Sequence, residues 1–249
     1  PFFEFTREFM NFEPEAWSLR WYRQMVGISS IGDTTVVTDK WMMGTRNSFF
    51  VGIVATLLAT ALGTVAALGL SRPHMPFKAV LMAILISPMI VPLIITAAGM
   101  FFFYSKIGLT HTYLGLILAH TALGTPFVVI TVTATLTGFD TNLIRASQSL
   151  GADTMRTFFK VIMPLILPGV ISGGLFAFIT SFDEVVIVMF IGSVEQITIP
   201  KQMWAGLRQE TSPVILCMAT CLVALSIALL TTVEMLRRRS ERLRGIKQR

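Results

Sequence analysis

The chain has 249 residues, of which 53% are hydrophobic and only 14% are charged, and it carries a formal net charge of +6 with a mean hydropathy of +0.71. In a soluble domain about a quarter of the residues are charged, so this composition excludes an ordinary soluble domain. The long apolar runs do not alternate, which excludes a membrane β-barrel and predicts an all-α, polytopic membrane bundle.

Five stretches are long and apolar enough to cross a bilayer as helices, which takes about 20 residues each. In chain order they are 48–70, 79–103, 113–137, 161–191 and 213–236. None of the 20 Lys and Arg residues falls inside these spans. The chain therefore divides into an extracytoplasmic segment, 1–47, and a transmembrane domain, 48–249, with a cytoplasmic loop at 138–164.

The Lys and Arg residues of the short connections set the orientation. With the C-terminal tail in the cytoplasm, the inner connections hold twelve Lys and Arg against three acidic residues, and the outer connections hold eight of each sign. We therefore expect a multi-pass membrane protein with a cytoplasmic C-terminus. Its excess positive charge then faces anionic lipid and indicates no nucleic-acid partner.

The first 47 residues contain a cluster of Trp17, Trp21 and Tyr22, which predicts a short helix lying at the membrane interface. Because the chain begins at Pro1 with this segment outside, we expect that an earlier span or a removed segment precedes it.

The first two spans differ in character. The span 48–70 is rich in Ala, Gly and Thr, so it is expected to pack closely against other helices. The span 79–103 carries Pro88 and Pro92 near its middle, and each removes a backbone hydrogen bond. The break they predict is either a packing kink or part of a transport path, because only protein or a water-lined cavity satisfies free backbone groups in a membrane.

The remaining candidates for chemistry are few. His120, in the third span, is either a functional intramembrane residue or a satisfied packing residue. Cys217 and Cys221 are expected to be small packing residues. The sequence shows no metal-ligand cluster, no nucleophile with a base, and no phosphate-binding loop. We therefore expect no catalytic site, no metal site and no cofactor bound by this chain.

The connection after the third span is a polar elbow. Its first part predicts a short helix with Leu143, Ala146 and Leu150 on one side. Gly151 is expected to end this helix in a left-handed conformation, and Asp153 is expected to cap the helix that enters the membrane. Such a bent surface helix is either a knob that docks in a partner's groove or a polar loop without a partner.

Two acidic residues, Asp183 and Glu184, fall within the predicted span 161–191. Each costs about 2.5–3.5 kcal/mol at a helix centre, and no Lys or Arg in a span offsets them. They are expected either to attract a cationic solute or to hydrogen-bond a neighbouring helix or partner subunit. The candidate solute pathway consists of Asp183, Glu184, Ser181, His120 and Pro92.

The outer connection 192–212 carries a second candidate surface. Lys201, Met203 and Trp204 are expected either to contact an extracytoplasmic protein or, for the tryptophan, to anchor the chain at the headgroup level.

The elbow resembles the "EAA" loop of permease subunits of ATP-binding-cassette importers. Ala146, Gly151 and Pro164 match that pattern outright, and Val161 and Met163 replace its apolar residues. The residues Arg145 and Ser147 depart from the pattern. Arg145 stands where the pattern has a glutamate, so the charge at this position is reversed. The stretches "WSLRWY", "GLILAHTALGTPFVV" and "SFDEVVIVMFIGSVEQITIPKQMW" resemble the polyamine and opine branch of these permeases. The resemblance covers essentially the whole chain.

This resemblance implies a type I importer permease in a bacterial inner membrane, with six spans, of which the first is missing here. It implies an ATPase pair that holds ATP and magnesium, a second permease and a periplasmic solute-binding protein as partners. The docking residues for the ATPase would be Arg145, Ala146, Ser147, Leu150, Gly151, Ala152 and Asp153. The alternative function is a stand-alone ion-coupled transporter or channel, for which Asp183, Glu184 and His120 offer the ion site.

Overall fold

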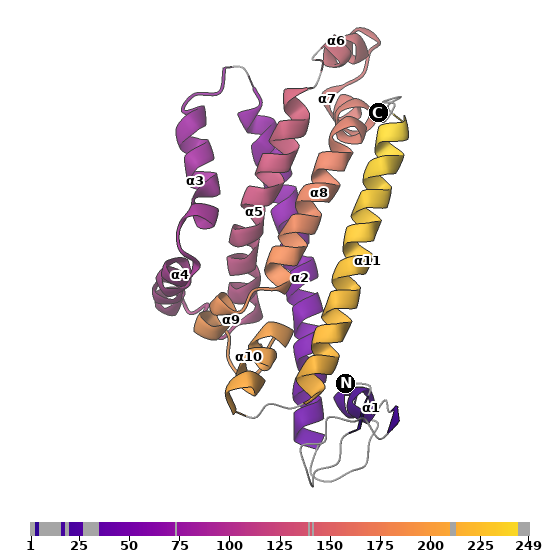
Figure 1. Cartoon of the computed structure of the whole chain (residues 1–249). Helices are drawn as coiled ribbons and strands as arrows, with labels where there is room; N and C mark the ends of the chain where they lie inside the picture. The colour runs from indigo at the N-terminus through magenta and orange to yellow at the C-terminus, as the bar shows by residue number, and fades with distance from the viewer. Residues whose placement is uncertain are drawn as a thin grey trace.

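The computed structural model describes residues 3–4, 16–17, 20–26, 35–72, 74–138, 140, 142–209 and 213–243. Two short strands precede a series of helices (Figure 1). The elements are β1 (Phe3–Glu4), β2 (Ala16–Trp17), α1 (Arg20–Val26), α2 (Thr35–Leu70), α3 (Lys78–Ile90), α4 (Leu93–Ile107), α5 (Tyr113–Thr137), α6 (Asn142–Ser149), α7 (Thr154–Thr157), the π-helical turn η1 (Phe158–Ile162), α8 (Met163–Phe182), α9 (Val186–Ile191), α10 (Ile199–Gln209) and α11 (Pro213–Leu243).

Three long helices, α2, α5 and α8, pack against one another and form the core of the bundle (Figure 1). Small and β-branched side chains fill their contact, as is common where membrane helices approach closely. The buried members of this cluster are Ala59, Ala67, Val128, Val132, Ile166, Val170 and Ala177. The expectation that the small residues of 48–70 pack against neighbouring helices is confirmed.

Glycines set the distance between α5 and α8. A Cβ atom added to Gly173 would lie 2.7 Å from the Cα of Val128, and one added to Gly124 would lie 2.9 Å from the Cβ of Ala177. Cβ atoms essentially never come this close to other heavy atoms, so only glycine permits the observed approach. The helices are therefore held by backbone-to-backbone packing over several turns.

Among the described residues, four helices are long and apolar enough to cross a membrane, at Lys40–Leu70, Tyr113–Thr137, Thr154–Phe182 and Val214–Thr232. A fifth span arises if α3 and α4 are counted together, although they meet at an angle of 103°. Pro92 stands at this bend as the residue before α4, and Pro88 lies inside α3. The predicted break of the second span is confirmed, and the predicted all-α membrane bundle with it.

The predicted fourth span, 161–191, is wrong in its boundaries. The helical span begins earlier, at Thr154, and ends at Phe182. A break at Asp183 separates α8 from the short helix α9. The acidic pair therefore lies beyond the end of the spanning helix and not in its middle.

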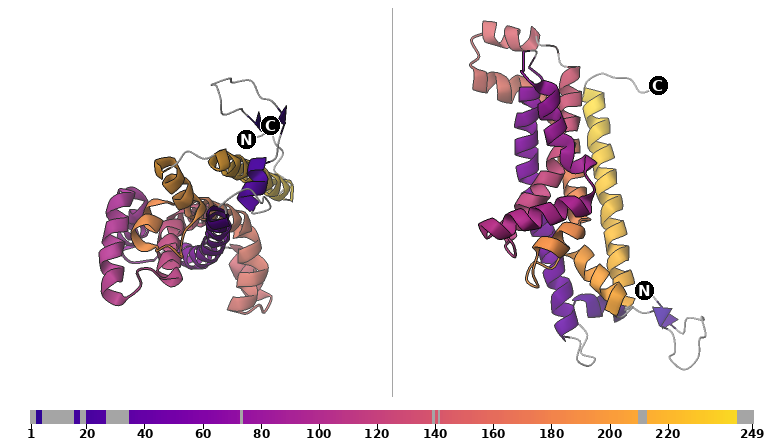
Figure 2. Two further views of the ribbon diagram at one scale, coloured as in Figure 1. Left: turned by 90° about the horizontal axis from the view of Figure 1, so that it is seen from below. Right: turned by 90° about the vertical axis from the view of Figure 1, so that its left-hand side faces the viewer.

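The two ends of the bundle differ in what they carry (Figures 1 and 2). One end holds α6, α7 and the last turns of α11, together with the connection between α2 and α3. The other end holds α1, α10 and the beginning of α2. The grouping agrees with the predicted topology, in which the elbow and the C-terminus share one side of the membrane.

About half of the predicted outer segment 1–47 belongs to the described residues. Trp17 lies in β2, which pairs with β1, and is therefore outside the predicted interfacial helix. Trp21 and Tyr22 do lie on a helix, α1, which packs against α2 and α11. Residues 5–15, 18–19 and 27–34 lie outside the described residues.

Candidate functional site

The elbow begins with α6 and turns at Gly151. Gly151 has φ of +80°, the left-handed conformation that glycine adopts without a steric penalty. The side chain of Asp153 accepts a hydrogen bond of 2.7 Å from the backbone N–H of Arg156 and so caps α7. Both predictions for the bend are confirmed.

The elbow is held as a unit and exposes its outer surface. The hydroxyl groups of Ser147 and Thr157 lie 2.9 Å apart and join α6 to the start of the spanning helix. Leu150 is 88% exposed, and Arg145 and Ala146 are also exposed. Met155, in α7, is 66% exposed and is an apolar residue that the pattern before Gly151 does not indicate. The elbow thus presents an unburied apolar surface at the end of the bundle.

The break after α8 gives its two acidic residues different surroundings. Asp183 is exposed, and its backbone N–H closes the last turn of α8 by donating to the carbonyl oxygen of Ile179. Glu184 is only 7% exposed, and its Oε1 accepts a hydrogen bond of 2.9 Å from the N–H of Ile187. The carboxylate of Glu184 is therefore bonded to the first turn of α9, and Asp183 is the exposed member of the acidic pair.

A buried polar contact joins α5 to α8 close to this break. The Nδ1 atom of His120 lies 2.7 Å from the Oγ of Ser181, and His120 is only 1% exposed. Its Nε2 atom has no hydrogen-bond partner among the residues that the structure describes. The structure thus brings two of the predicted pathway residues together inside the bundle, whereas Pro92 lies exposed at the bend between α3 and α4.

A cluster of hydrogen bonds pins the outer connection between α9 and α10 to α2. The side-chain amide of Asn47 donates to the carbonyl oxygens of Glu195 and Ile197 at 2.7 and 2.8 Å. The hydroxyl group of Tyr113 donates to the Oδ1 of Asn47 at 3.0 Å. The hydroxyl oxygen of Ser48 accepts from the N–H of Ile199 at 2.8 Å. This connection is therefore fixed to the bundle, and its position follows that of α2.

Lys201 takes part in the same region. Its ammonium group donates to the carbonyl oxygens of Val188, Gly192 and Ser193 at 3.2–3.3 Å. A lysine at this place adds a charged donor to the carbonyl groups at the end of α9. Burial lowers the pKa of the Lys201 ammonium group. The ammonium group of Lys201 is therefore bonded within its own chain. Met203 and Trp204, the other two predicted contact residues, have different surroundings.

Met203 is partly buried against Trp41 and Ile199, whereas Trp204 is 43% exposed. The guanidinium carbon of Arg208 lies 5.2 Å from the centre of the Trp204 ring, within the range of a cation–π contact. Of the three predicted residues, Trp204 therefore offers the largest exposed surface to a protein or to lipid headgroups.

We expect Lys201→Met to loosen the outer connection, because three carbonyl oxygens at the end of α9 lose the hydrogen bond from the ammonium group. Each such hydrogen bond from a charged group contributes about 1.5–3 kcal/mol. Amide hydrogen exchange in residues 192–199 measures the effect and should become faster by about tenfold or more. Lys106→Met is the matched control, since Lys106 lies exposed in the last turn of α4. Unchanged exchange in Lys201→Met would leave Lys201 available for an external partner.

Comparison with known proteins covers most of the chain. Residues 59–242 match the family described as "Binding-protein-dependent transport system inner membrane component". The chain is 26% identical to the spermidine/putrescine transport system permease protein PotC of Haemophilus influenzae, over 95% of this chain and 88% of that protein. It is 27% identical to the putrescine transport system permease protein PotI of Escherichia coli, over 83% of this chain and 73% of that protein.

Solved structures show the same arrangement of helices. A chain of the MetNI methionine ABC transporter in inward-facing conformations superposes with a TM-score of 0.57 at 21% identity. A chain of an amino acid ABC transporter superposes with a TM-score of 0.62 at 16% identity. Each comparison covers 82% of this chain and 95% of the other. At these identities the likeness concerns the fold.

Proposed function

The chain belongs to the family of binding-protein-dependent transport system inner membrane components, and from this premise we propose that it moves a small, polyamine-like cation across the bacterial inner membrane as the permease subunit of an ATP-driven importer. The observation that carries the proposal is the elbow: a capped, exposed bend that leads directly into a spanning helix of the core. The relatives named above transport spermidine and putrescine, which supports a cationic solute.

In this proposal the elbow transmits the effect of ATP binding in a partner subunit to the helix bundle. ATP changes the state of a transporter only if it favours one conformation over another. A change in the ratio of two conformations from ~1:99 to ~99:1 requires that ATP bind one of them more tightly by about 5.5 kcal/mol. A separate ATPase pair that holds ATP and magnesium delivers this difference by docking against α6. Since Ser147 and Thr157 join the elbow to the helix that continues into α8, movement of the elbow passes into the bundle.

The proposed complex has further members. A second permease subunit completes the pathway, and a periplasmic solute-binding protein delivers the solute at the end that carries α10 and Trp204. The C-terminus then lies in the cytoplasm on the side of the elbow. This chain itself is a non-catalytic subunit. The family match and the transport systems of the relatives favour an ATP-driven importer over an ion-coupled carrier or channel.

Asp183 carries the proposed specificity for cations. A carboxylate near a cationic solute at a protein surface contributes on the order of 1–4 kcal/mol, so we expect Asp183→Asn to lower uptake at limiting solute by about tenfold or more. Uptake of radiolabelled spermidine and putrescine into cells measures the effect, with copurification of the ATPase subunit as the test of assembly.

The matched control is Glu195→Gln, which removes an acidic side chain that is also exposed in the outer part of the chain. This control should transport normally. Full uptake by Asp183→Asn would remove the assignment of Asp183, whereas loss of the ATPase subunit from the purified wild-type complex would remove the proposed function itself.

A further inference from the structure

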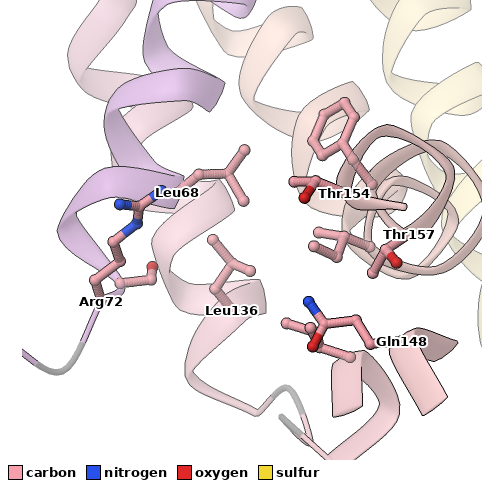
Figure 3. Close-up of a pocket in the computed structure, with 10 residues that line it drawn as sticks. Leu68, Arg72, Leu136, Gln148, Thr154 and Thr157 are labelled. Carbon is pink, nitrogen blue, oxygen red and sulfur yellow. The ribbon is translucent and has the colours of Figure 1, made fainter. Parts of the chain in front are cut away.

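A cavity of about 360 Å³ lies behind the elbow, where α2 and α5 end (Figure 3). Figure 3 shows Leu68 and Arg72 on one side of it and Gln148, Thr154 and Thr157 on the other, with Leu136 between them. The remaining lining residues are Ser71, Ile144, Phe158 and Ile162. The cavity therefore joins the core helices to both arms of the elbow.

The lining of this cavity is amphipathic. Leu68, Leu136 and Ile162 give it an apolar wall, whereas Arg72, Gln148 and Thr154 are exposed polar residues. The apolar residues come from or adjoin candidate spanning helices, and Arg72 lies two residues after α2 ends at Leu70. The polar lining residues therefore lie at or beyond the ends of the candidate spans, where the headgroups of a bilayer are expected.

The charge at this end of the bundle favours an anionic ligand. Outside α11, the described Lys and Arg residues of this end are Arg72, Lys78, Arg145, Arg156 and Lys160. Outside α11, the described acidic residues there are Asp140 and Asp153, and the Oδ1 of Asp153 is engaged in capping α7. Basic pockets between membrane helices on the cytoplasmic side bind the headgroups of anionic lipids.

We propose that this cavity binds one anionic phospholipid, with an acyl chain against Leu68 and Leu136 and the phosphate beside Arg72. The occupant separates the elbow from the ends of α2 and α5, because Ile144 and Gln148 belong to α6. The lipid thus fills the space into which the elbow would otherwise collapse. This inference concerns the resident membrane, so it holds for any transported solute and goes beyond the proposed function.

The test uses the whole purified transporter complex in nanodiscs of phosphatidylcholine with an increasing fraction of dioleoyl-phosphatidylglycerol. Native mass spectrometry counts the phosphatidylglycerol that stays bound after transfer to detergent. One cationic residue at the surface contributes about 1 kcal/mol to the binding of an anionic lipid, so Arg72→Ala should need about fivefold more phosphatidylglycerol for the same occupancy. Lys78→Ala should behave as the wild type, since Lys78 does not line the cavity.

A second variant tests the cavity without changing charge. Leu136→Trp fills the space and should abolish retention of phosphatidylglycerol, and Ile144→Phe serves the same purpose if Leu136→Trp does not fold. ATP-driven uptake should depend on phosphatidylglycerol in the wild type and lose this dependence in the filled variants.

Four results would overturn the proposal. Wild-type retention in Arg72→Ala would show that the ligand is not selected by its charge, and wild-type retention in the filled variants would place the lipid outside the cavity. Displacement of the lipid by millimolar inorganic phosphate would indicate a site for a free anion. Absence of retained lipid from the wild-type complex would mean that a partner subunit covers the cavity.

Discussion

Replacing Gly151 with valine is expected to remove most ATP-driven uptake while the chain still folds and assembles. Gly151 has φ of +80°, and nothing lies within 4 Å of the position that a Cβ atom would take. The expected free-energy cost therefore comes from the left-handed backbone conformation and not from a steric clash of the side chain. A left-handed conformation costs an L-residue about 1–2 kcal/mol, and more for a β-branched one, so the observed bend becomes at least about tenfold less populated.

The measurement for Gly151→Val is solute-stimulated ATP hydrolysis together with uptake in reconstituted vesicles. We expect hydrolysis to lose its dependence on solute, since the elbow no longer holds one angle between α6 and the spanning helix. Gly138→Val is the matched control, because Gly138 has an ordinary φ of −92° and equally open surroundings. Normal coupling in an assembled Gly151→Val complex would show that the bend is not the element that transmits the movement.

Replacing Gly173 with valine is expected to prevent α5 and α8 from packing. A Cβ atom on Gly173 would contact the Oγ1 of Thr131 and would lie 2.7 Å from the Cα of Val128. The neighbour in the second contact is backbone and cannot turn aside, so the helices must separate. Overpacking of a core costs about 1–3 kcal/mol, and close packing of small residues is a main source of stability between membrane helices.

The thermal stability of the purified chain tests this expectation, for example by the temperature at which half the protein is lost from the monodisperse peak. We expect a fall on the order of 5–10 °C in Gly173→Val. Gly99→Val makes the same chemical change in α4, where a Cβ atom would meet nothing within 4 Å, and should leave the stability close to that of the wild type. Equal stability of the two variants would contradict the close contact of α5 and α8.

The parts of the fold that local chemistry determines could be predicted from the sequence. The third span was predicted at its observed bounds, because its apolar run stops at residues that also stop a helix: Thr112 caps its start and Gly138 follows its end. The elbow was predicted for the same reason. The bend at Gly151 and the cap at Asp153 depend only on neighbouring residues, so both can be read from the local sequence.

Two other parts of the fold could not be predicted from the apolar pattern. The break after Phe182 is flanked by apolar residues on both sides, so composition alone continues the helix to 191. The contact of the Glu184 side chain with the N–H of Ile187 is local, but the apolar run around it hides this signal. The contact of Asn47 with Glu195 joins residues 148 positions apart, and a lone asparagine in an apolar stretch carries no signal for it.

The central claim is that nucleotide chemistry in a partner subunit drives transport through the elbow of this chain. The most direct measurement compares vesicles that contain this chain and its second permease with vesicles that also contain the ATPase pair, each supplied with solute-binding protein and labelled putrescine. We predict transport only with the ATPase pair and hydrolysable ATP, and none with a proton or sodium gradient alone. Accumulation of putrescine on an ion gradient in the vesicles without the ATPase pair would contradict the account.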